Sequence, residues 1–144
     1  MKYLSVILAL LLGALSAQAQ TAPDLKGTWT GKGKSVVFGA NQHHPGSAPN
    51  DNTPRIREFD FTFVVTGQEG PLVWGHNFSS VSAEQEPFAW AVASDGKTIV
   101  GADTDGSYRV SVVSADRMEL CYTHPGTSPS KSIVATCSMI DRKK

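Results

Sequence analysis

The chain has 144 residues, and its 13 basic and 13 acidic side chains balance to a formal charge of zero at pH 7. This balance argues against a nucleic-acid partner, because neutralising phosphates requires lysine and arginine in excess on one surface. A chain of this length builds one hydrophobic core rather than two. The composition therefore predicts a single domain that does not bind nucleic acid.

The first residues, MKYLSVILALLLGALSAQAQ, have the layout of a secretory signal peptide. A lone lysine precedes an apolar run over residues 4–15, and Ala17 and Ala19 flank the point where a signal peptidase would cut. The run is shorter than the roughly 18 residues that a membrane-spanning helix needs. We therefore expect a signal peptide at residues 1–19 and a periplasmic or secreted domain at residues 20–144, without membrane attachment after cleavage.

Two cysteines, Cys121 and Cys137, remain in the exported chain. An oxidising compartment favours their pairing. The residues from His124 to Lys131 are typical of a turn, and a hairpin centred near residue 129 would place the two cysteines directly opposite each other. No CxxC spacing suggests a redox role, so we predict a structural disulfide.

Apolar and polar residues alternate along most of the chain after Gly27, and no stretch keeps a helical period. In REFDFTFVVTG, for example, Phe59, Phe61, Phe63 and Val65 share one face. The turn-forming sequences GQEG, SDGK, DTDG and SADR separate these stretches at nearly regular intervals. We predict strands at residues 28–38, 57–66, 72–79, 88–93, 98–102, 108–113, 118–123 and 132–140.

Eight antiparallel strands in chain order leave two exposed sheet edges unless the first strand pairs with the last. Closure removes both edges. The sequence therefore predicts an all-β fold, an eight-stranded up-and-down barrel, with a β-sandwich as the alternative. The interior of such a barrel is either filled by side chains or holds one small ligand.

The stretch DLKGTWTGKGKS places Gly27, Thr28 and Trp29 at the head of the first strand. This opening resembles the Gly-x-Trp start of lipocalin and avidin barrels. The resemblance implies that Trp29 plugs the closed end and that Arg142, near the end of the last strand, stacks on it. It also implies that the long polar loop at residues 40–54, ANQHHPGSAPNDNTP, lies over the open end.

Biotin binding is not expected from this resemblance. Ser35 stands where streptavidin-like proteins carry a serine that contacts biotin, but Gly31 replaces the asparagine that they place shortly after the tryptophan. Their later biotin-binding tryptophans have no clear match. The overall pattern also resembles small exported bacterial proteins of unknown function.

No motif marks an enzyme, a metal site or a cofactor site. The histidines show no HxxxH or HExxH spacing, DTDG lacks the later glutamate of a calcium loop, and no G-x-S-x-G is present. DTDG is therefore interpreted as a hairpin turn, and His43 and His44 as loop residues. We expect no metal, no cofactor and no enzymatic activity.

The aromatic residues supply the candidate ligand site. Trp74, His76 and Phe78 share one face of PLVWGHNFS, and Phe88 and Trp90 share one face of PFAWAV. Inward aromatics would fill the barrel, whereas inward alanines would leave a lumen and expose the aromatics outside. We expect the aromatics to point inward, because exposed rows of tryptophan favour aggregation. A histidine among inward aromatics would give an apolar pocket one polar group. The predicted ligand-binding residues are His43, His44, Trp74, His76 and Trp90.

The sequence is compatible with three functions. The first is an exported, non-catalytic barrel that binds a small apolar or amphipathic molecule at its open end. The second is a protein-binding module, such as a periplasmic inhibitor of a secreted hydrolase, because small barrels with one disulfide resemble bacterial metalloprotease inhibitors in outline. The third is an enzyme of unidentified chemistry. The sequence does not indicate an oligomeric state.

Overall fold

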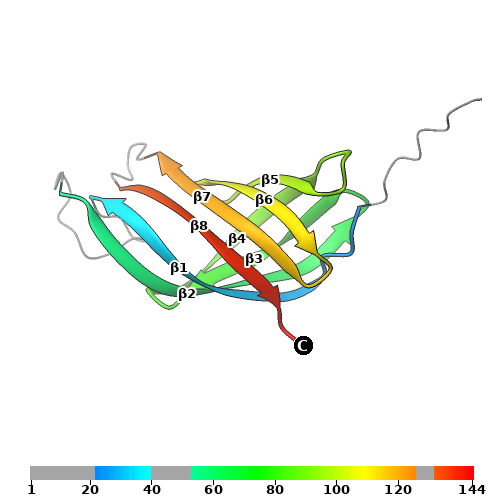
Figure 1. Ribbon diagram of the computed structural model, residues 1–144, viewed down its shortest axis with the longest axis horizontal. Coiled ribbons are helices and arrows are strands. Elements are labelled where there is room, and N and C mark those ends of the chain that lie inside the picture. The colour runs from blue at the N-terminus through cyan, green and yellow to red at the C-terminus, as the bar shows by residue number, and fades with distance from the viewer. Residues whose placement is uncertain (1–21, 40–52, 126–131) are drawn as a thin grey trace, which may run out of the picture.

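The computed structural model describes residues 22–39, 53–125 and 132–144, and here eight antiparallel strands close into one barrel (Figure 1). The strands follow chain order around the barrel, and the first pairs with the last. They are β1 (Gly27–Phe38), β2 (Arg55–Glu69), β3 (Leu72–Ser79), β4 (Ser82–Val92), β5 (Thr98–Ala102), β6 (Ser107–Ser114), β7 (Arg117–Pro125) and β8 (Ile133–Arg142). The predicted all-β barrel is confirmed.

The largest difference from the predicted strand bounds is in β4, which begins at Ser82 rather than at Phe88. The missed segment, SAEQEP, is polar and contains Pro87, which cannot donate to a sheet ladder. β4 pairs with β5 only from Ala89 to Val92, so the first half of β4 has a neighbour on its β3 side alone. A proline is tolerated on such an unpaired edge, which explains why a strand persists through this sequence.

Trp29 closes one end of the barrel and is fully buried. Its indole Nε1 donates a hydrogen bond to the Leu25 carbonyl oxygen at 2.9 Å. The guanidinium carbon of Arg142 lies 4.3 Å from the centroid of the indole. Arg142 Nη2 also donates to the carbonyl oxygens of Asp24 and Ala115, at 2.7 and 3.2 Å. Arg142 thus ties the segment before β1 to the β6–β7 turn across the plug, the arrangement that the Gly-x-Trp resemblance implies.

Glycines on the inner wall lie opposite aromatic residues of neighbouring strands. The register pairs are Gly31 with Phe61, Gly33 with Phe59, Gly75 with Phe88 and Gly101 with Trp90. A Cβ added at Gly101 would lie only 2.1 Å from Cδ1 of Trp90, and one added at Gly33 would lie 2.9 Å from Cζ of Phe59. The rings therefore cover bare backbone, and the glycines provide the space that large aromatics need inside a narrow barrel.

The inward position of Gly75 reverses the face expected for Trp74 and His76 of β3. Val73 is buried, whereas Trp74 is 46% exposed, and alternation along the strand places His76 on the outer face with Trp74. Phe88 and Trp90 of β4 are buried inside. The prediction that aromatics point inward is therefore right for β4 and wrong for Trp74 and His76 of β3. At residue 75 the Val64 carbonyl oxygen and the Phe88 ring leave no space for an inward side chain.

We expect Gly101→Ala to lower the free energy of unfolding by about 1 to 3 kcal/mol, as overpacking a close-packed core does. The added Cβ would lie 2.7 Å from the Ala89 carbonyl oxygen as well as against Trp90, so both backbone and ring must move. Urea denaturation measures the change. Trp90→Phe should lower the free energy of unfolding less in the Gly101→Ala variant than in the unaltered protein. Equal decreases would refute the packing argument.

Cys121 and Cys137 face each other across β7 and β8 and form a disulfide, with their Cα atoms 4.0 Å apart. The predicted disulfide is confirmed, and it is consistent with an oxidising, extracellular compartment. Its neighbours Leu120 and Tyr122 point inward, so the bond lies on the outer side of the barrel wall.

Several predictions concern residues outside the described ranges. These are the signal peptide at residues 1–19, most of the loop at residues 40–54, and with it His43 and His44. They stay predictions. In the part of the chain that the structure describes, there is no helix with the length and apolar character needed to cross a membrane.

Candidate functional site

A cavity of about 100 Å³ lies in the barrel at the end opposite Trp29. Its apolar wall includes Phe59, Phe61, Phe63, Leu120 and Val134. An engineered apolar cavity of about 150 Å³ accommodates benzene. The cavity therefore suits a group about the size of one small ring, and a larger ligand would extend into the mouth.

The floor of the cavity is a continuous set of aromatic rings. The Phe63 ring makes edge-on contacts with Phe61 and Tyr108, with centroids 6.0 and 5.5 Å apart. The Tyr108 and Tyr122 centroids are 4.9 Å apart. Aromatic pairs at these distances add to the stability gained by burial. They give the cavity a rigid apolar floor with two phenol hydroxyls at its edge.

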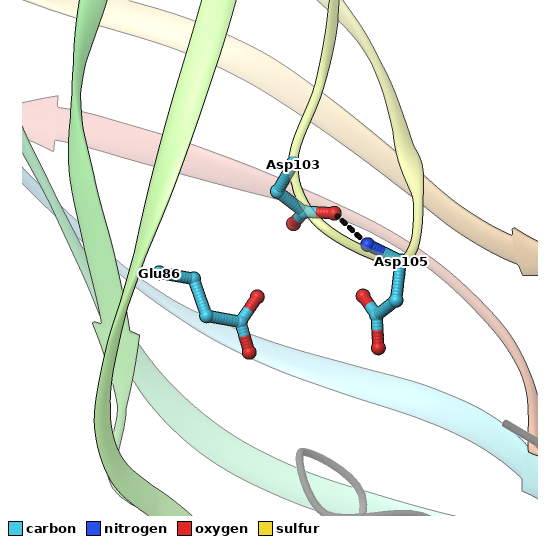
Figure 2. A group of neighbouring side chains, drawn as sticks. All are labelled: Glu86, Asp103 and Asp105. Carbon is cyan, nitrogen blue, oxygen red and sulfur yellow. Dashed lines mark hydrogen bonds between the residues drawn. The ribbon is translucent and has the colours of Figure 1, made fainter. Parts of the chain in front are cut away.

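Three carboxylates gather at one side of the mouth. Figure 2 shows Glu86 reaching from β4 toward Asp103 and Asp105 on the β5–β6 turn, and one oxygen of each lies within 4.8 Å of the others. Asp103 Oδ1 accepts hydrogen bonds from the backbone N–H groups of Asp105 and Gly106, at 3.2 and 2.7 Å. DTDG is therefore a hairpin turn, as predicted, closed by its first aspartate.

The two buried tyrosines hold this turn from inside the barrel. Tyr108 donates its hydroxyl to Asp103, and Tyr122 donates to Asp105 Oδ1 at 2.7 Å. Burial is the main cause that raises the pKa of Tyr108 well above its ordinary value, and the negative charge of Asp103 is the second. The same two causes, in the same order, raise the pKa of Tyr122. Both phenols therefore stay protonated and remain donors.

His124 and Ser132 lie behind Asp105 and are both buried. His124 Nδ1 is 3.4 Å from Asp105 Oδ2 and 3.3 Å from Ser132 Oγ. A serine nucleophile needs a histidine that contacts serine and carboxylate through its two different ring nitrogens. Here both neighbours approach the same nitrogen, so these three residues do not form a catalytic triad.

A second polar group lies on the β1–β2 side of the cavity. Ser35 of β1 pairs directly with Arg57 of β2, and both residues line the cavity. Ser35 is only 6% exposed, and Arg57 is half-buried. The mouth thus carries acidic groups on the β4–β5 side and a guanidinium with a hydroxyl on the other.

The structure does not gather the predicted ligand-binding residues around the cavity. Trp74, His76 and Trp90 are not among the residues that line it. Trp90 is buried beside Phe63 and Phe88, with ring centroids 5.3 and 4.4 Å away. Its Nε1 lacks a hydrogen-bond partner within the described chain.

The residues that do line the mouth include several that sequence reasoning missed, namely Arg57, Glu86, Asp103, Tyr108 and Tyr122. For Arg57, the sequence pattern does indicate such a role. Arg57 is in phase with the inward-facing Phe59, Phe61 and Phe63, and a charged residue at an inward position of a barrel strand indicates a polar site inside.

No family model matches the chain, and no curated protein matches it either. Among solved structures, the chain is similar to an S-type phycobiliprotein lyase, CPES, from Guillardia theta, with a TM-score of 0.50 and 11% sequence identity. The match covers 83% of this chain and 89% of that one. At this identity the likeness concerns the fold alone, and it fits a calycin-type barrel.

Proposed function

We propose that this protein is an exported, non-catalytic barrel that binds one small amphipathic molecule in the cavity at its open end. The observation that carries the proposal is the cavity of about 100 Å³, which combines an aromatic floor with a polar mouth. A few convergent polar groups around an apolar hollow are typical of small-molecule sites. Export is supported by the signal-like sequence at residues 1–19 and by the disulfide between Cys121 and Cys137.

The closed half of the barrel interior stabilises the fold, and the open half is available to a ligand. Trp29, Ile99, Val110, Met118 and Ile140 are fully buried and fill the closed half. Burying apolar surface is favourable by about 25 cal/mol per Å². An apolar group placed on the Phe61 and Phe63 rings gains this energy without moving the packed half. A ligand can thus be exchanged at the mouth while the core stays intact.

A matched pair of substitutions on β8 tests the proposal. Val134 is buried and lines the cavity, whereas its neighbour Ile133 is 51% exposed on the outer face. We expect Val134→Phe to fill the cavity and weaken binding of the neutral probe phenethyl alcohol at least about tenfold, a change of ~1.4 kcal/mol. Ile133→Phe introduces the same ring on the outside and should bind like the unaltered protein.

Isothermal titration calorimetry measures the probe affinity, and circular dichroism with thermal melting checks that both variants fold. Equal binding by the Val134→Phe and Ile133→Phe variants would place the site elsewhere. Absence of binding by the unaltered protein to this probe, to its carboxylate analogue and to its amine analogue would refute a small-molecule site in the cavity.

A further inference from the structure

We infer that the molecule bound in this cavity carries a carboxylate group, which Arg57 and Ser35 receive, on a small apolar body. This inference rests on the proposed function and specifies its ligand class. It depends on two polar side chains that line the cavity and whose bonding capacity the described residues leave unused.

Arg57 is the first of these side chains. It lies on the inner face of β2, half-buried at the cavity wall, and its guanidinium makes no hydrogen bond or ion pair with another residue of the described ranges. By contrast, Arg117 contacts Asp141 and Arg142 contacts Asp116. A guanidinium taken partly out of water and left unpaired is unfavourable, and its planar fork matches a carboxylate with two parallel hydrogen bonds.

Ser35 is the second. Its side chain is buried and lines the cavity, yet its hydroxyl has no hydrogen-bond partner among the residues that the structure describes. Ser132, which is also buried, contacts His124, and the cavity-lining Thr136 donates to the Lys34 carbonyl oxygen at 2.9 Å. The Ser35 hydroxyl is not among the fully enclosed polar atoms without a partner in the described chain, so it is accessible from the cavity. It is therefore available to donate to a hydrogen-bond acceptor of a ligand.

Ser35 and Arg57 lie close enough to bind the same functional group of a ligand. Ser35 and Arg57 are directly opposite in the β1–β2 register, and residues so paired have Cβ atoms about 4.5 to 5.5 Å apart. A carboxylate between them accepts from the guanidinium and from the hydroxyl together. The rings of Phe59 and Phe61, next along β2 and also lining the cavity, then receive the apolar body.

The carboxylates across the mouth limit the ligand to one anionic group. Asp103 and Asp105 already accept hydrogen bonds from Tyr108 and Tyr122, and Glu86 has interactions of its own. Their negative charge would repel a second carboxylate on the ligand. The geometry therefore points to a monocarboxylate whose enclosed part is about the size of one ring or a short branched alkyl chain.

Three probes with the same phenyl body test this inference: phenylacetate, phenethyl alcohol and phenethylamine, titrated by calorimetry near neutral pH. We expect phenylacetate to bind about tenfold or more tightly than the alcohol, since a hydrogen bond to a charged group contributes about 1.5 to 3 kcal/mol. The amine should bind most weakly. Arg57→Gln and Ser35→Ala should each reduce phenylacetate affinity toward that of the alcohol and leave alcohol affinity unchanged.

Arg109→Gln is the control for net charge, because Arg109 is exposed and lies outside the cavity. It should leave the preference for phenylacetate intact. If Arg57→Gln does not fold, Arg57→Lys is the alternative variant. It keeps the positive charge but not the planar guanidinium, and it should still lose part of the preference for phenylacetate over the alcohol. Alcohol or amine binding as tightly as phenylacetate, or an unchanged preference in the Arg57 variants, would overturn the inference while leaving the binding proposal standing. No binding of any probe would overturn both.

Discussion

Replacing Trp29 with alanine is expected to lower the free energy of unfolding by about 3 to 5 kcal/mol, the usual cost of deleting a large buried aromatic side chain. Trp29 is fully buried and bonded to the Leu25 carbonyl, so the substitution removes apolar contacts and leaves a cavity at the closed end. Chemical denaturation followed by circular dichroism measures the loss.

The stacked contact between Trp29 and Arg142 gives this prediction its control. Arg142→Ala should destabilise the fold less than Trp29→Ala, because a cation over an indole contributes about 0.5 to 2 kcal/mol. Residues in contact share their interaction energy, so the double variant should lose less than the two single losses added together. Arg142→Lys should also destabilise, since lysine cannot reach several carbonyl oxygens with one planar group. Strictly additive losses would contradict the plug described for the closed end.

Removing the disulfide by Cys121→Ala together with Cys137→Ala is expected to lower the free energy of unfolding by about 3 kcal/mol. This is the value that the chain-entropy model gives for a loop of this size. The two cysteines are 16 positions apart in sequence. They lie on the outer side of the barrel wall, so little packing is lost and the effect comes from greater freedom of the unfolded chain.

Denaturation of the double alanine variant, compared with the unaltered protein under oxidising and reducing conditions, checks this expectation. The reduced protein should match the variant. Thiol labelling of unfolded, unreduced protein should find no free sulfhydryl. Two reactive thiols, or a variant as stable as the oxidised protein, would show that the disulfide does not stabilise the fold.

The barrel itself could be predicted because its determinants are local. Alternation along each strand and tight turns fix the strand order, and avoidance of free edges then favours closure of β1 on β8. The pairing of Cys121 with Cys137 follows from the centre of a single hairpin. The first half of β4 could not be predicted, because its sequence is polar and contains Pro87, and only the brief pairing of β4 with β5 makes this proline tolerable in a strand.

The site was harder to predict because it depends on which inward residues leave space. Gly75 on the inner wall turns Trp74 outward, and this could have been read from a glycine within a strand. Arg57, in phase with inward phenylalanines, also carried a signal. By contrast, Glu86 meets Asp103 and Asp105 only through the short β4–β5 pairing and the path of one turn, which no local pattern specifies.

Native mass spectrometry of the protein purified from its natural source tests the central claim most directly. The account predicts that the folded protein carries one small molecule, which is released on denaturation, and that the Ile133→Phe variant carries it while the Val134→Phe variant does not. A retained polypeptide in place of a small molecule would favour a protein-binding module instead. Unaltered protein whose native mass equals that of the bare chain would contradict the claim that the cavity is a ligand site.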